Sequence, residues 1–128
     1  MRTVHLKQGF PTLDEARRRL LRELAQAEAQ GIRLLKVVHG WGSNGEGGVL
    51  SIGIRKSLRL RVKEGRALAL IPGERFATDT AEAREVLARH PSLRRDVDFN
   101  RGNPGITILE LAPSSRPRSD ASLRPPTI

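Results

Sequence analysis

The chain has 128 residues, enough for one domain with a modest core, and only 3% of them are aromatic. It contains no cysteine, which excludes disulfides and thiolate metal sites. The formal net charge of +9 favours a polyanion such as nucleic acid as the partner. No apolar run is long enough to span a membrane and no signal peptide precedes the first expected strand, so we expect a cytoplasmic protein.

The first elements have clear sequence signals. Residues 1–8 alternate weakly between apolar and polar side chains and predict a short strand with one buried face. Thr12 and Glu15 form a capping box that predicts the start of a helix, and Gly31 predicts its end. The arginines at 17–19 on this helix could contact phosphate, but a solvated helix face is the interpretation we favour.

A glycine-rich run at residues 39–48 follows a buried strand at 33–38 and precedes a helix from about 48 to 63. Glycines leave room for a ligand, and the first turn of a helix presents unpaired N–H groups with a partial positive charge. Together these features predict an anion site, most often for phosphate. The alternative is a tight or flexible connection without a ligand.

The helix at 48–63 carries a basic ridge beside its apolar stripe. Residues 55–66 contain six basic residues and one acidic residue, a concentration that an even genome-wide arginine bias would not produce. At 100° per residue the members of the ridge share one arc of the helix, and they are Arg55, Lys56, Arg59 and Lys63. We expect phosphate contacts, which give affinity rather than sequence choice; the alternative is a solvated face.

The second half of the chain predicts a third strand at 67–71, a helix from Asp79 or Thr80 to about Arg89, and a last strand at 105–111. Residues 92–104 read as irregular. Residues 113–128 are rich in proline, serine and arginine, lack a packing pattern, and are expected to be disordered.

These motifs together resemble the small-MutS-related (Smr) domain family. His39-Gly40-Trp41-Gly42 after two valines resembles the family's "V-I-H-G-x-G" signature, residues 12–16 (TLDEA) resemble its "T-V-E-E-A", and residues 105–108 (GITI) resemble its closing "G-A-T-V-V" strand. The resemblance covers about residues 3–112. It implies an α/β fold, a two-layer βαβαβ-type sandwich with a mixed, mostly parallel sheet, similar to the C-terminal domain of bacterial translation initiation factor three. It also implies binding of DNA or RNA and, in several members, DNA-nicking or RNA endonuclease activity.

The chain departs from the family pattern in two places. The first strand of the family normally carries "L-D-x-H", but here His5 stands where the Asp would be and Lys7 where the His would be. The carboxylate that the resemblance implies as a metal ligand or general base is thereby missing, so Mg²⁺ would be expected only if cleavage is retained. The second departure is an insertion at about 72–104, so that we divide the chain into a domain at 1–112 and a tail at 113–128.

The candidate catalytic residues are His39, His5 and Lys7, and no metal ligands are predicted. His39 lies at the carboxyl end of a strand and could act as acid or base, or could be a buried ring that orients the loop. His5 and Lys7 could equally be exposed strand residues. The candidate nucleic-acid-binding residues are the basic ridge with Gly40, Trp41, Gly42, Ser43, Gly45, Gly47 and Gly48.

Trp41 could stack on an unpaired base or anchor the loop by packing. The leading functional hypothesis is a nucleic-acid-binding domain with a possible nuclease activity. An inactive adaptor that docks on RNA, such as a ribosome, is the first alternative. The second is a domain for a small phosphorylated ligand, because Gly40, Gly42 and Gly45 match the dinucleotide pattern G-x-G-x-x-G.

Overall fold

The computed structural model describes residues 1–41 and 45–113. Of the expected tail at 113–128, residues 114–128 therefore lie outside the described residues. The chain alternates strands and helices in the order β1 (Arg2–His5), α1 (Leu13–Ala29), β2 (Leu34–Val38), α2 (Gly45–Lys63), β3 (Ala67–Pro72), α3 (Ala81–Arg89) and β4 (Ile106–Leu111). Two short 3-10 helices, η1 (Gly73–Arg75) and η2 (Pro91–Arg95), flank α3. The predicted α/β class is confirmed.

The four strands form one mixed sheet in the order β1-β2-β4-β3. β1 and β2 pair parallel, whereas β4 runs antiparallel to both of its neighbours. Three strands therefore share one direction, as expected, but only one of the three pairings is parallel. The reason is the long segment between β3 and β4, which leaves and returns at the same end of the sheet, where Pro72 pairs with Thr107. This order also differs from the parallel doubly wound sheet of dinucleotide-binding domains.

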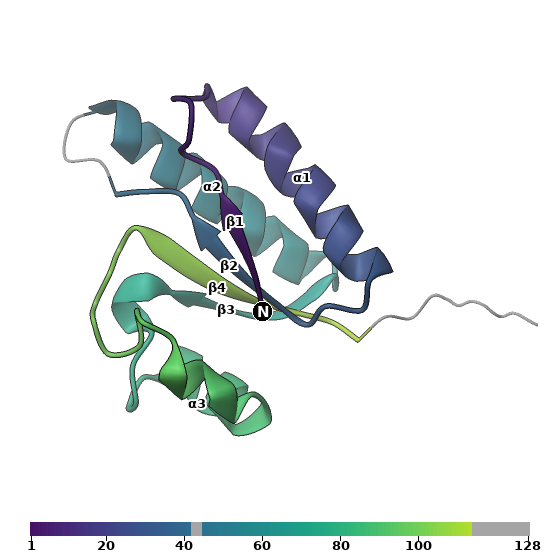
Figure 1. Cartoon of the computed structure of the whole chain (residues 1–128), viewed down its shortest axis with the longest axis vertical. Coiled ribbons are helices and arrows are strands. Elements are labelled where there is room, and N and C mark those ends of the chain that lie inside the picture. The colour runs from purple at the N-terminus through teal and green to yellow at the C-terminus, as the bar shows by residue number, and fades with distance from the viewer. Residues whose placement is uncertain (42–44, 114–128) are drawn as a thin grey trace, which may run out of the picture.

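One face of the sheet is covered by α1 and α2 (Figure 1). The capping box is present as predicted, with the Glu15 N–H donating to Thr12 Oγ1 and the Thr12 N–H to the Glu15 carboxylate. The core on this face is aliphatic throughout. Its fully buried side chains include Leu6, Leu20, Leu24, Leu35, Ile54, Leu58 and Leu109.

The opposite face is covered by the insertion, whose helix α3 lies across the sheet from α1 and α2 (Figure 1). A second core forms there around Ile71, Ile108 and Leu87, and Phe76 packs edge to face against Phe99 at 5.2 Å between ring centroids. The insertion thus adds a third layer to the predicted two. A third layer can form because β2 and β4 present apolar side chains to both faces of the sheet.

Buried charges hold the insertion to the sheet. Lys36 on β2 is 7% exposed, and its ammonium donates to Asp96 at 2.8 Å and also contacts the Asp98 carboxylate. Burial alone would lower the pKa of Lys36, but the bonds from the two carboxylates outweigh it and raise that pKa. Lys36 therefore remains charged although it lies inside the protein.

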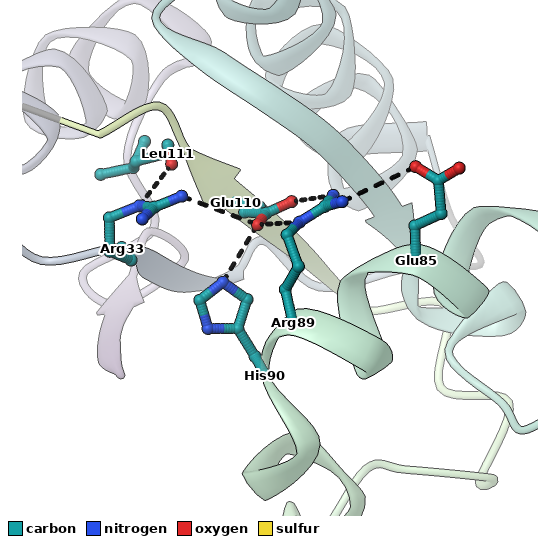
Figure 2. A network of polar contacts seen from close by, with 6 residues as sticks. All are labelled: Arg33, Glu85, Arg89, His90, Glu110 and Leu111. Atoms are coloured by element: carbon teal, nitrogen blue, oxygen red, sulfur yellow. Dashed lines mark hydrogen bonds and ion pairs between the residues drawn. The ribbon is translucent and has the colours of Figure 1, made fainter.

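A second buried charge, the carboxylate of Glu110 on β4, binds the carboxyl end of α3 (Figure 2). Arg89 donates to both of its oxygens at 2.8 and 2.7 Å, His90 Nε2 lies at 3.0 Å, and Arg33 completes the cluster at 3.8 Å. Burial raises the pKa of Glu110, but the bonds from Arg89 and His90 more than offset it and keep that pKa low. Glu110 therefore stays ionised against the core.

None of the helices in the described part of the chain combines the length and apolar character needed to cross a bilayer.

Candidate nucleic-acid interface

The glycine-rich run and the end of β1 meet at one end of the sheet. Because β1 and β2 pair parallel, with His5 opposite Val38, the loops that follow them lie side by side (Figure 1). The Leu6 N–H continues the ladder to the Val38 carbonyl at 2.9 Å. The amino-terminal turns of α1 and α2 open at this same end, so their partial positive charges add there.

His39 lies beneath this end and is fully buried. Its Nδ1 lies 2.8 Å from the Gly40 carbonyl oxygen, which can only accept, so Nδ1 carries the proton. Nε2 lies 2.8 Å from Thr107 Oγ1 and accepts from that hydroxyl. Burial lowers the pKa of His39 to about 4, and the nearby Arg55 charge adds to the effect. The ring is neutral at pH 7, and this geometry favours the alternative in which His39 orients the loop.

Gly40 is the point at which the two loops touch. Its φ of +76° lies in the left-handed region that favours glycine. The N–H groups of His39 and Gly40 both donate to the Gly105 carbonyl at 3.0 Å. A Cβ added at Gly40 would lie 2.9 Å from Lys7 Cδ, so the lysine stem passes directly over this glycine. Gly40 therefore permits the close approach of Lys7. Lys7 stands where the His of the family's "L-D-x-H" motif would be, so that position lies beside the His-Gly motif.

The structure does not bring His5 to His39. Val4 and Leu6 face the core under α1 and α2, so His5, one position between them, points to the other face and is exposed. Trp41 follows Gly40 and is 54% exposed, so about half of its side chain is open to solvent. Of the three candidate catalytic residues, only Lys7 is exposed next to the glycine-rich run.

The remaining glycines fall partly on the helix. α2 begins at Gly45, three residues before the expected start, so Gly45, Gly47 and Gly48 belong to its first turn. Gly42 and Ser43 lie outside the described residues. A helix that starts with glycines has no side chains covering the N–H groups of those positions.

The basic ridge is divided by the fold. Arg55 donates to both oxygens of Glu74, at 2.8 and 2.6 Å, and to the Pro104 carbonyl at 3.0 Å. These bonds from Arg55 lower the pKa of Glu74 and commit the arginine to joining α2 to the insertion. The other members, Lys56, Arg59 and Lys63, are exposed. The exposed part of the ridge therefore begins at Lys56, and Arg55 does not belong to it.

The sequence did not reveal what two residues of this site contact. The Thr107 hydroxyl donates to His39 Nε2, and Glu74 pairs with Arg55, although they lie 68 and 19 residues away from their partners. Glu74 belongs to no motif, whereas Thr107 lies in the GITI segment that resembles the family's closing strand, and only the return of the insertion to the sheet places both of them. Sequence pattern could have offered them only as members of a strand and a turn.

The residues at this end do not suit a divalent metal ion. Mg²⁺ prefers oxygen ligands, chiefly carboxylates, whereas Lys7 is a cation and the His39 nitrogens are both engaged. Within residues 1–41 and 45–113 no group of three or more His, Asp or Glu side chains could hold a metal. The described residues at this end thus do not supply the donor set that metal-assisted cleavage would need.

Comparison with known proteins agrees with this arrangement. The model of the Smr domain family matches residues 8–72, just over half of the chain, so the chain belongs to the Smr domain family. The match ends where the insertion begins. Among solved structures, the crystal structure of the Smr domain of Thermus thermophilus MutS2 superposes with a TM-score of 0.53 and 23% identity, over 88% of this chain and all of the other. That likeness is one of fold. No curated protein sequence gave a significant match.

Proposed function

We propose that this domain binds nucleic acid through the end of the sheet where Lys7, Gly40 and the first turn of α2 meet. Lys7 supplies a flexible exposed cation, and the glycine-opened helix start supplies N–H groups for the same phosphate. The exposed Lys56, Arg59 and Lys63 extend the positive charge along α2. The observation that carries the proposal is the position of Lys7, laid over the glycine of the family's signature motif.

We further propose binding without cleavage, with DNA or RNA as the ligand. General acid–base catalysis needs a group that can reach the scissile phosphate and exchange a proton near neutral pH. His39 is buried with a pKa of about 4, and Lys7 replaces a family residue without restoring the missing carboxylate. A role as an adaptor on structured RNA, such as a ribosome, fits these features. A nicking or RNA endonuclease activity is the second candidate, favoured by the place of Lys7, whose charge would stabilise a phosphorane.

The test is a titration of labelled single- and double-stranded DNA and RNA, with and without Mg²⁺, in which binding and cleavage are followed together. We expect binding that falls steeply with salt, through release of counterions, and no cleavage. Lys7→Gln should weaken binding to all sequences alike and reduce the salt slope by about one. The matched control is Arg94→Gln, an exposed cation on the insertion side of the sheet, which should change neither.

Three results would count against this proposal. Affinity that does not change with salt would exclude phosphate contacts as its source. A loss of binding in Arg94→Gln equal to that in Lys7→Gln would mean that only total charge matters. Cleavage that disappears in Lys7→Gln would establish the endonuclease candidate in place of the adaptor.

A further inference from the structure

A shallow groove runs between the β1–α1 loop and the exposed side of α1. Its walls are Gly9 and Pro11 from the loop and four residues of the helix, Glu15, Arg18, Arg19 and Arg22. The helical positions are separated by three and four residues, so they form one continuous face. An adjoining groove shares Gly9 and Arg19 and continues along β1 past His5. No residue of α2 lines either groove, so this surface is separate from the α2 ridge.

The groove is cationic because its lining contains three arginines and only one carboxylate. Glu15 accepts the Thr12 N–H at 2.8 Å, and the bonds from Thr12 hold the pKa of Glu15 below its usual value. Arg19 reaches only the Gln8 carbonyl, at 3.3 Å, and Arg18 makes one long, well-exposed contact of 3.7 Å with Asp14. Arg22 has no ion-pair or hydrogen-bond partner within the part of the chain that the structure describes. Three guanidinium groups are thus free to bind an anion.

Phe10 is the residue between Gly9 and Pro11, and both of these neighbours line the groove. Its side chain is 97% exposed and its φ is +50°, a left-handed conformation that is unfavourable for a bulky residue. The chain has only three phenylalanines, and the other two pack against each other in the insertion. The exposed Phe10 ring does not contribute to the hydrophobic core. Residues with an unfavourable backbone conformation of this kind are concentrated at binding sites.

We propose that this groove binds single-stranded nucleic acid, with phosphates on Arg18, Arg19 and Arg22 and an unpaired base stacked on Phe10. The three cations argue for a polyanion, and the exposed ring argues for a base whose face is accessible. Bases within a duplex have both faces covered by their neighbours, so the ring selects unpaired nucleotides. This inference rests on the proposed nucleic-acid binding and adds the strand type that this domain prefers.

The test compares Phe10→Ala with the wild type on two labelled single strands of equal length, one with all its bases and one abasic. Phe10→Ala should weaken binding to the intact strand at least about five-fold, the equivalent of one stacked base, and leave the abasic strand unchanged. Val97→Ala, which removes another exposed apolar side chain (72%) on the insertion side, is the matched control and should affect neither. An equal loss on both strands, or no loss on the intact one, overturns the stacking assignment.

The arginine part of the proposal is tested with Arg22→Gln against Arg94→Gln. Arg22→Gln should weaken binding to the intact and abasic strands by the same factor, because both carry the phosphates, whereas Arg94→Gln should not. Binding that depends on Lys7 but not on Phe10 or Arg22 overturns this inference alone. No binding of any nucleic acid by the wild type overturns the proposed function as well. A Phe10→Ala protein with altered oligomeric state and unaltered binding would assign the ring to a contact between copies instead.

Discussion

Both faces of the sheet have an apolar core, but the insertion face also encloses charged side chains, and adjacent residues of β2 show the difference. Leu35 enters the aliphatic core under α1 and α2. Lys36 points the other way and is equally enclosed, but by Asp96 and Asp98 of the insertion. On that face Glu110 is likewise buried among Arg33, Arg89 and His90 (Figure 2).

The difference explains why apolar contacts can be predicted from the sequence and buried charge pairs cannot. Apolar burial is non-directional and leaves a periodic pattern, whereas a buried charge is tolerated only with particular partners in a particular geometry. The family model also ends at residue 72, so it covers the helices of the first face and not the insertion. We infer that buried charge pairs fasten the insertion to the sheet together with the apolar cluster around Ile71, Ile108 and Leu87.

The largest loss of stability should come from removing the positive charge of Lys36. Lys36→Met keeps the volume of the stem but leaves two enclosed carboxylates without a cation, which should cost about 4 kcal/mol of unfolding free energy. Leu35→Ala should cost about 3 kcal/mol by leaving a cavity. Denaturant titrations at falling pH separate the two, because protonation of the carboxylates should relieve the first loss and not the second. A pH-independent loss in Lys36→Met would contradict the charge-based account of this face.

Replacing a glycine by alanine should also cost different amounts of stability on the two faces. A Cβ at Gly73, at the start of the insertion, would overlap the Asn103 carbonyl oxygen and lie 2.7 Å from that of Ile106, so the backbone itself would have to move. We expect Gly73→Ala to cost about 3 kcal/mol. Thermal unfolding would measure it, and a melting temperature equal to that of the wild type would show that this turn adapts freely.

The buried ring of His39 should make the stability depend on pH. Because its folded pKa of about 4 lies below the ordinary 6.5, the unfolded chain takes up the proton first, so the full stability is present above pH 6.5 and is lost as the pH falls toward 4. The loss attributable to this residue is about 3 kcal/mol. His39→Gln should flatten the slope measured by denaturant titration at several pH values, and His5→Gln, at an exposed position, should leave it unchanged. Equal slopes in the two variants would refute a neutral buried His39.

The smallest effect is expected at Gly53, where α2 passes α1. A Cβ there would lie 2.5 Å from Leu13 Cδ1, the flexible end of a side chain that can rotate away. Alanine also gains about 1 kcal/mol in helix propensity over glycine. We therefore expect the melting temperature of Gly53→Ala to stay close to that of the wild type, in contrast to Gly73→Ala. A loss as large as at Gly73 would show that the α1–α2 contact cannot relax.

Much of the site could be anticipated, but not how its residues are used. The glycine run after a buried strand predicted an anion site at residues 39–48, and the structure places the stem of Lys7 over Gly40 of that run. The pattern could not show that His39 is enclosed, since a strand-end histidine looks the same whether it faces solvent or Thr107. The helical pattern also assigned Arg55 to the phosphate-binding ridge with Lys56, Arg59 and Lys63. Helical spacing could not show that Glu74 pairs with Arg55.

By itself the sequence determined the α/β class, the order of strands and helices and the aliphatic face under α1 and α2, because these follow from local periodicity and capping. The tertiary structure alone decided which charges are buried, which face the insertion covers and which cations remain free. Those outcomes depend on contacts between segments far apart in the chain, such as Lys36 with Asp96, 60 residues away. Phe10 belongs to the same class, because only the folded chain shows that its side chain is exposed to solvent and that its neighbours Gly9 and Pro11 line a groove with three arginines.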